Sequence, residues 1–158
     1  MNIRKATGQD GPVLLHLIHA LAEYEKLDPP DAGAQKRLVA ELSNKNPRFE
    51  AYIADEGEVP VGYAIIFETY SSFAALPVLY LEDLFVLPEF RKKKAGLALF
   101  RSVVSEAQRR GCARLEWVVL SWNEPAIQFY RKLGAVRLSD WHTYRLTGDL
   151  FQSVLGGR

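Results

Sequence analysis

The chain has 158 residues, enough for one domain with a single hydrophobic core. Its 20 Lys and Arg residues nearly balance its 19 Asp and Glu residues, so it lacks the basic excess of most nucleic-acid binders. The N-terminus has no apolar signal core, no segment approaches the roughly 18 apolar residues of a membrane span, and the single Cys112 excludes an intrachain disulfide. We therefore expect a cytoplasmic protein with neither a membrane nor a nucleic-acid partner.

Hydrophobic periodicity and turn residues divide the chain into strands and helices. In chain order we expect a strand at 2–6, a helix ending near 25, a less regular helix at 33–43, strands at 49–55, 59–70 and 79–87, a helix ending at 111, a strand at 113–120, a helix at 123–134, and a last strand or strand pair at 136–146.

The ends of these elements carry recognisable signals. Thr7 and Asp10 offer capping side chains to the first helix, and Pro125 suits the first turn of the last helix. Gly111 can end the third helix, and the Glu56–Gly57 pair predicts a hairpin turn.

The order β-α-α-β-β-β-α-β-α-β indicates a mixed α/β (α+β) fold whose first half is largely antiparallel. We expect a single domain over residues 1–158. The strand at 79–87, the helix after it and the strand at 113–120 form a crossover unit. A ligand is then expected at the start of that crossover helix.

The stretch EFRKKKAGLAL, Glu89 to Leu99, lies at that point. A helix start presents unpaired N–H groups and the positive end of the helix dipole, so it suits a phosphate. The consecutive cations add charge, and Gly96 permits close approach of a ligand. A solvated basic patch or a nucleic-acid contact would have the same local composition, so the spacing alone leaves all three open.

Several motifs resemble those of the GNAT acetyltransferases. RKKKAG approximates R-x-x-G-x-G/A, the acetyl-CoA pyrophosphate motif of that family, and SWNEPAIQFYRKLGA resembles its second signature, with Asn123 and Tyr130 at matching places. LYLEDLFVLPEFR and LAEYE are similar to the diamine acetyltransferase branch, which includes spermidine/spermine and thialysine acetyltransferases. The resemblance extends over roughly residues 3 to 146.

The resemblance implies the GNAT fold, acetyl-CoA as cosubstrate and direct acetyl transfer to a primary amine in a ternary complex. It also implies a homodimer. It makes Glu82 the base and Tyr130 the general acid. The residues expected to contact acetyl-CoA are Leu84, Phe85, Val86, Arg91, Lys92, Lys93, Lys94, Ala95, Gly96, Leu97, Asn123 and Tyr130. Those expected to contact the amine are Tyr24, Glu25, Glu82, Asp83, Tyr70 and Ser71.

One position departs from the motif, because Lys94 occupies the place of its first glycine. A lysine with positive φ costs about 1 kcal/mol. Its ammonium offsets that cost if it reaches a phosphate of the cosubstrate.

Glu82 lies mid-strand among apolar residues, so we expect burial to raise the pKa of its carboxyl towards that of a useful base. An alternative is a structural ion pair with an Arg or Lys in the sheet. Glu82 and Asp83 point to opposite faces of a regular strand. A bulge, usual at this strand in the family, would bring both near the cleft and turn the N–H groups of Leu84, Phe85 and Val86 towards the thioester.

The amine is predicted less closely. Ser71 resembles the thialysine type rather than the polyamine type, which has an acidic residue there, so a thialysine- or lysine-like amine is expected ahead of spermidine. A protein lysine or N-terminal acetyltransferase, and a CoA-binding module without catalysis, stay open as alternatives. We expect no metal site, and His16 and His19 are the only closely spaced histidines.

Overall fold

The computed structural model describes residues 1–156, which form two compact units. The first is Met1–Val118 and the second begins at Val119. Each unit is described by itself below.

A five-stranded sheet runs through the first unit in the order β1-β2-β3-β4-β5. Its strands are β1 (Asn2–Lys5), β2 (Glu50–Glu56), β3 (Val59–Ser71), β4 (Leu76–Val86) and β5 (Leu115–Glu116). The first four are antiparallel neighbours, whereas β4 and β5 are parallel, as the predicted crossover requires.

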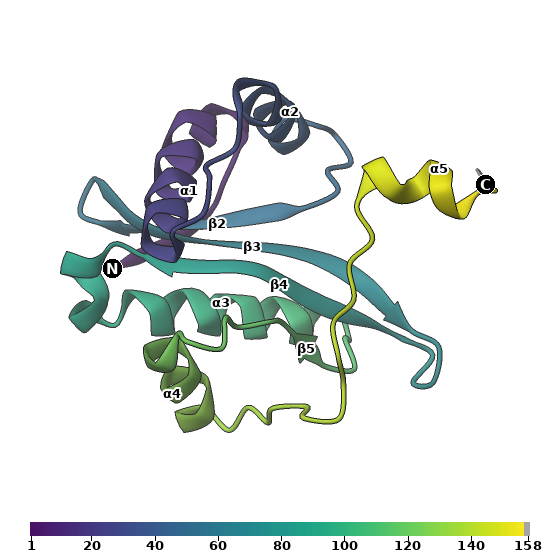
Figure 1. Ribbon diagram of the computed structural model, residues 1–158. Helices are drawn as coiled ribbons and strands as arrows, with labels where there is room; N and C mark the ends of the chain where they lie inside the picture. Colours follow the sequence, from purple (N-terminus) through teal and green to yellow (C-terminus); the bar gives the residue numbers. More distant parts are fainter. Residues whose placement is uncertain (157–158) are drawn as a thin grey trace. The chain divides into compact units, whose positions relative to one another are not determined.

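Helices cover both faces of this sheet (Figure 1). α1 (Gly11–Glu25) and α2 (Ala32–Leu42) lie on one face, and α3 (Ala95–Arg109) lies on the other. Leu14 and Leu17 of α1 pack with Ile53, Tyr63 and Phe85 of the strands in one buried cluster. This cluster fixes the C-terminal end of α1 above β3 and β4.

The two ends of α1 show why it begins and ends where it does. The Asp10 carboxylate accepts hydrogen bonds from the Thr7 backbone N–H at 2.8 Å and from the Thr7 hydroxyl at 3.0 Å, which closes the chain before the helix. Lys26 ends α1 in the left-handed conformation, with φ 57° and ψ 40°.

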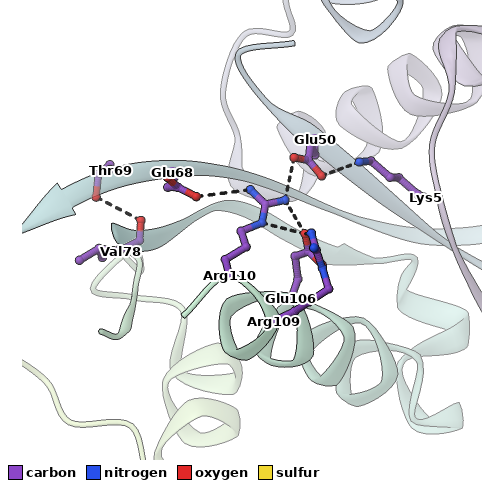
Figure 2. Close-up of polar contacts among 8 residues, drawn as sticks. All are labelled: Lys5, Glu50, Glu68, Thr69, Val78, Glu106, Arg109 and Arg110. Carbon is purple, nitrogen blue, oxygen red and sulfur yellow. Dashed lines mark hydrogen bonds and ion pairs between the residues drawn. The ribbon is translucent and has the colours of Figure 1, made fainter. Parts of the chain in front are cut away.

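Arg110 attaches the C-terminal end of α3 to the sheet (Figure 2). Its guanidinium lies 2.7 Å from a Glu50 oxygen and 2.6 Å from a Glu106 oxygen, and Arg109 contacts the same Glu106. Hydrogen bonds from Arg109, together with Arg110, lower the pKa of Glu106 to about 2. The helix that begins at the basic stretch is thus anchored at its other end.

The second unit contains α4 (Glu124–Lys132), a short 3-10 turn at Gly148–Leu150 and α5 (Phe151–Val154). The strand predicted at 136–146 is wrong, since no strand follows β5 within residues 1–156. The strand predicted at 113–120 is reduced to Leu115–Glu116, which pair with Leu79 and Tyr80. Both segments have β-forming residues, but a strand also needs a neighbouring edge to pair with.

Within residues 1–156, no helix combines the length and the apolar character needed to cross a membrane.

Candidate active site

A bulge in β4 determines where its two acidic residues lie. Ile65 pairs with Asp83 while the next residue, Ile66, pairs with Leu81, so Glu82 is the extra residue on β4. Leu81 is buried, Glu82 is exposed and Asp83 is half-buried. The predicted bulge is confirmed, but the burial predicted for Glu82 is wrong, because the bulge places Asp83 on the covered face instead.

Asp83 is held by a buried tyrosine of the neighbouring strand. The Tyr63 hydroxyl donates a hydrogen bond to Asp83 Oδ2 at 3.2 Å, and Tyr63 is fully buried. Burial raises the pKa of Asp83 to about 6, and the negative charges of Glu82 and Glu25 add to the rise. Tyr63 was not among the predicted site residues, and only the register of β3 against β4 reveals it.

The end of α1 contributes a third carboxylate to this cluster. Glu25 is half-buried, and burial raises the pKa of its carboxyl. The Tyr24 ring beside it lies 6.2 Å from the Phe85 ring, centroid to centroid. The negative charges of Glu25 and Glu82 both act on Asp83, so the three carboxylates make this part of the first unit favourable for a cation.

Two predicted amine contacts lie elsewhere in the first unit. Tyr70 and Ser71 are at the far end of β3, and Ser71 lies six residues along the strand from Ile65, roughly 20 Å away. The Ser71 hydroxyl accepts hydrogen bonds from the Ala74 N–H at 3.2 Å and from Arg114 Nη1 at 3.3 Å. Ser71 therefore closes a turn, and this chain does not bring it to Asp83.

Beyond the bulge, one edge of β4 has no neighbouring strand within residues 1–156. β5 pairs only with Leu79 and Tyr80. The Leu87 N–H donates to the Val61 carbonyl on β3, so alternation along an antiparallel ladder also directs the Phe85 N–H to β3. Of the three N–H groups predicted to face the thioester, those of Leu84 and Val86 are therefore the two that face the open edge.

The basic stretch forms a 3-10 turn, Pro88–Lys93, that leads directly into α3. The Ala98 N–H donates to the Lys94 carbonyl at 3.0 Å, so the N–H groups of Ala95, Gly96 and Leu97 precede the first hydrogen bond of α3. Lys94 has φ 65° and ψ 13°, the left-handed conformation that the glycine of the motif would adopt freely. The lysine thus has the backbone conformation that we expected of glycine at this place in the motif.

The four cations of the stretch are used differently. Arg91 Nε donates to the Val86 carbonyl at 3.0 Å, and Lys93 Nζ lies 2.8 Å from Glu56 Oε2. Lys92 and Lys94 are exposed and form no ion pair with residues 1–156. The ammonium groups of these two lysines are therefore accessible to a dissolved phosphate.

The second unit carries the other two predicted residues. Asn123 caps α4, and its side-chain oxygen accepts from the Ala126 N–H at 3.3 Å. Tyr130 lies on α4 with its ring 5.2 Å from that of Phe129, and burial raises the pKa of the Tyr130 hydroxyl. Such a tyrosine is a weaker acid than free tyrosine, so its hydroxyl stays protonated at neutral pH and can donate a hydrogen bond to a developing anion.

Within residues 1–156, no three His, Cys, Asp or Glu side chains are grouped as ligands for a metal ion.

Comparisons with known proteins agree with this arrangement. Residues 17–135 match the model of the acetyltransferase (GNAT) family. Thialysine N-epsilon-acetyltransferase of Sus scrofa is 32% identical over 165 residues, covering 98% of this chain and 96% of that protein. L-ornithine N5-acetyltransferase NATA1 of Arabidopsis thaliana is 28% identical over 197 residues, covering 96% and 86%. An integron cassette protein of V. cholerae has the same fold, with a TM-score of 0.81, 22% identity and coverage of 99% and 98%. The chain therefore belongs to the GNAT family of acetyltransferases, which transfer an acetyl group from acetyl-CoA to an amine.

Proposed function

We propose that this chain acetylates the primary amine of a small cationic substrate in a ternary complex with acetyl-CoA. A thialysine-, lysine- or ornithine-like amine is preferred over a long polyamine. The observation that carries the proposal is the position of Asp83 at the bulge of β4, the strand that leads into the basic stretch: Tyr63 holds its carboxylate, and the charges of Glu25 and Glu82 act on it.

Removal of a proton from the amine is the first chemical requirement. An alkylammonium with a pKa of about 10 costs roughly 4 kcal/mol to deprotonate at pH 7. Asp83 and Glu25 bind the ammonium group, and Glu82, which is exposed to water, accepts its proton. The neutral nitrogen then attacks the thioester carbonyl carbon, the carbon–sulfur bond breaks, and CoA leaves as its thiolate. The nitrogen loses its remaining extra proton to water as the amide forms.

Two groups of residues hold the cosubstrate in this proposal. The N–H groups of Leu84 and Val86 meet the thioester and the pantetheine arm along the open edge of β4. The N–H groups of Ala95, Gly96 and Leu97, with Lys92 and Lys94, receive the pyrophosphate.

Asn123 and Tyr130 are assigned to the cosubstrate because they lie in the family's second signature. Asn123 holds the pantetheine arm, and Tyr130 donates a hydrogen bond to the departing thiolate. The match of one family model to residues 17–135, which include parts of both units, supports their working as one domain.

The preferred amine is proposed from the three carboxylates and from the relatives. Three acidic side chains near the bulge of β4 can neutralise one or two ammonium groups, but they are too few for a long polyamine. The thialysine and ornithine acetyltransferases that resemble this chain act on amines that carry an amino-acid head group. Ser71 no longer supports this choice, because its hydroxyl is used within the turn.

The test measures release of CoA thiol from acetyl-CoA with thialysine, lysine, ornithine, putrescine, spermidine and a lysine-containing peptide. We expect the highest kcat/KM with one of the amino-acid amines. Selective turnover of the peptide would support a protein acetyltransferase instead. Binding of acetyl-CoA without turnover of any amine would support a CoA-binding module.

We also propose that the protein acts as a homodimer in the cytoplasm. The dimer is supported by large apolar side chains of the second unit that are almost fully exposed, such as Val136, Trp141 and Tyr144 at 83%, 79% and 91%. Light scattering after size-exclusion chromatography should give twice the 17.9 kDa mass of the chain.

A further inference from the structure

We propose that Arg91 is a positioning residue that joins the acetyl-CoA loop to the amine-binding end of α1, and that it is not a phosphate ligand. This inference rests on the proposed function, because it concerns how the two substrate sites of that reaction are coupled. It changes the role of the residue at which the cofactor motif begins.

The guanidinium contacts β4 and α1. Its Nε donates to the Val86 carbonyl at 3.0 Å. Its Cζ atom lies 4.1 Å from the centroid of the Tyr24 ring and 5.7 Å from that of Phe85. One face of the planar guanidinium is thus occupied by aromatic rings, the arrangement in which Arg binds an aromatic surface.

The same rings lie next to the residues that hold the carboxylates. The Phe85 ring centroid lies 6.2 Å from that of Tyr24 and 6.4 Å from that of Tyr63, and the Tyr63 hydroxyl donates a hydrogen bond to Asp83. Tyr24 is also the chain neighbour of Glu25. A continuous set of neighbours therefore connects Arg91 with the two half-buried carboxylates, Asp83 and Glu25, that bind the amine in the proposed function.

Arg91 lies next to the residues that are proposed to bind the phosphate, so phosphate binding can affect the end of α1. Lys92 follows Arg91 immediately, and Lys94, the residue that precedes the first residue of α3, lies three positions after Arg91. A phosphate held by these lysines and by the α3 N–H groups restricts the loop, and the loop in turn restricts the Tyr24–Glu25 end of α1. Binding of CoA should therefore order the amine site before the amine arrives.

Hydrogen exchange of the full chain, with and without CoA, tests this coupling without requiring any amine. In the wild type, CoA should slow amide exchange at residues 22–27 at least about threefold. Arg91→Lys keeps the charge but loses the Nε donor and the flat face, so it should abolish this protection while changing the Kd for CoA less than twofold. Tyr24→Leu should have the same effect, and Tyr24→Phe, which keeps the ring, should retain the protection.

Lys92→Ala supplies the matched contrast. It removes a neighbouring cation that has no ring contact within residues 1–156, so it should raise the Kd for CoA about fivefold and leave the protection intact at saturating CoA. With an amine that the wild type acetylates, Arg91→Lys should raise the KM of that amine about tenfold. In a Tyr24→Leu background, Arg91→Lys should raise it no further.

Two results would overturn the inference. One is unchanged exchange at residues 22–27 when CoA saturates the wild type. The other is an Arg91→Lys variant that loses CoA affinity as Lys92→Ala does while keeping the wild-type response of α1. Absence of amine turnover by the wild type would count against the proposed function alone, since the exchange experiment still decides the role of Arg91.

Discussion

Replacing Lys94 by glycine should stabilise the protein and weaken its binding of acetyl-CoA. Lys94 has φ 65°, and a non-glycine residue in this region costs about 1–2 kcal/mol. Glycine avoids that cost, but it also gives the unfolded chain more conformational freedom, which destabilises the folded state by about 0.4–1 kcal/mol. The free energy of unfolding should therefore rise by about 0.5–1 kcal/mol, and Tm by about 2 °C.

The effect on binding has a separate cause. Because Lys94 already adopts the backbone conformation that glycine would adopt, the replacement should not change the backbone geometry of the expected phosphate site. The remaining difference is the lost ammonium, and an exposed charge pair at about 4 Å contributes about 1 kcal/mol. The Kd for acetyl-CoA should rise about fivefold at low salt, and the difference should shrink at high salt.

Two control variants separate the effects. Lys94→Ala removes the charge but keeps the backbone cost, so it should weaken binding without the gain in stability. Lys26→Gly makes the same replacement at the end of α1, where φ is 57° and no phosphate site is expected. It should stabilise the protein by a similar amount and leave the Kd unchanged. Thermal denaturation and isothermal titration calorimetry measure both quantities.

The reasoning would be refuted by a Lys94→Gly variant that is less stable than the wild type while Lys26→Gly is more stable. Tighter binding of acetyl-CoA by Lys94→Gly would likewise show that the lysine side chain obstructs the cradle rather than contributing to it.

Three further predictions concern other parts of the molecule. Tyr130→Phe should lower kcat about 10- to 100-fold, the effect of a hydrogen bond to a charged group, with an unchanged Kd for acetyl-CoA in calorimetry. Arg110→Met should lower the free energy of unfolding in urea by about 2 kcal/mol, because it leaves two partly buried carboxylates with fewer partners. Asp83→Asn should remove a pH dependence of stability. The pKa of Asp83 is about 6 in the folded wild type and 3.8 in the unfolded chain, so the folded state holds the proton more tightly. The free energy of unfolding of the wild type, relative to that of the variant, should therefore fall by up to about 2 kcal/mol between pH 4 and pH 7.

Each of these predictions has its own control. Equal losses in kcat and acetyl-CoA affinity for Tyr130→Phe would contradict its assignment to the thiolate. Arg109→Met removes an exposed partner of the same Glu106 and should destabilise the protein much less than Arg110→Met, so equal costs at Arg109 and Arg110 would argue against the anchor. Parallel stability curves for wild type and Asp83→Asn would show that this carboxyl has an ordinary pKa.

The parts of the fold predicted well are those that local chemistry determines. The Glu56–Gly57 turn, the capping residues before α1 and the glycine after α3 each impose a backbone conformation on their immediate neighbours. The predicted strand at 136–146 failed because its residues favour an extended chain without specifying which edge they pair with.

The details of the active site were also hard to predict, because they depend on strand register and on contacts between distant parts of the chain. The motif predicted that Glu82 and Asp83 would matter, but burial depends on which residue the bulge makes extra, and a shift of one residue exchanges the faces. Contacts such as those of Tyr63 with Asp83 and of Arg91 with Tyr24 join distant parts of the chain, so no local pattern announces them.

The most direct test of the account is the rate of CoA thiol release by Glu82→Gln with the preferred amine at pH 7. If Glu82 takes the proton of the ammonium group, kcat should fall by about 100-fold or more, with the Kd for acetyl-CoA unchanged and partial recovery as the pH approaches the pKa of the amine. Asp83→Asn should instead raise the KM of the amine more than it lowers kcat. A Glu82→Gln variant with the kcat of the wild type would contradict the claim that acetyl transfer uses the carboxylates of β4.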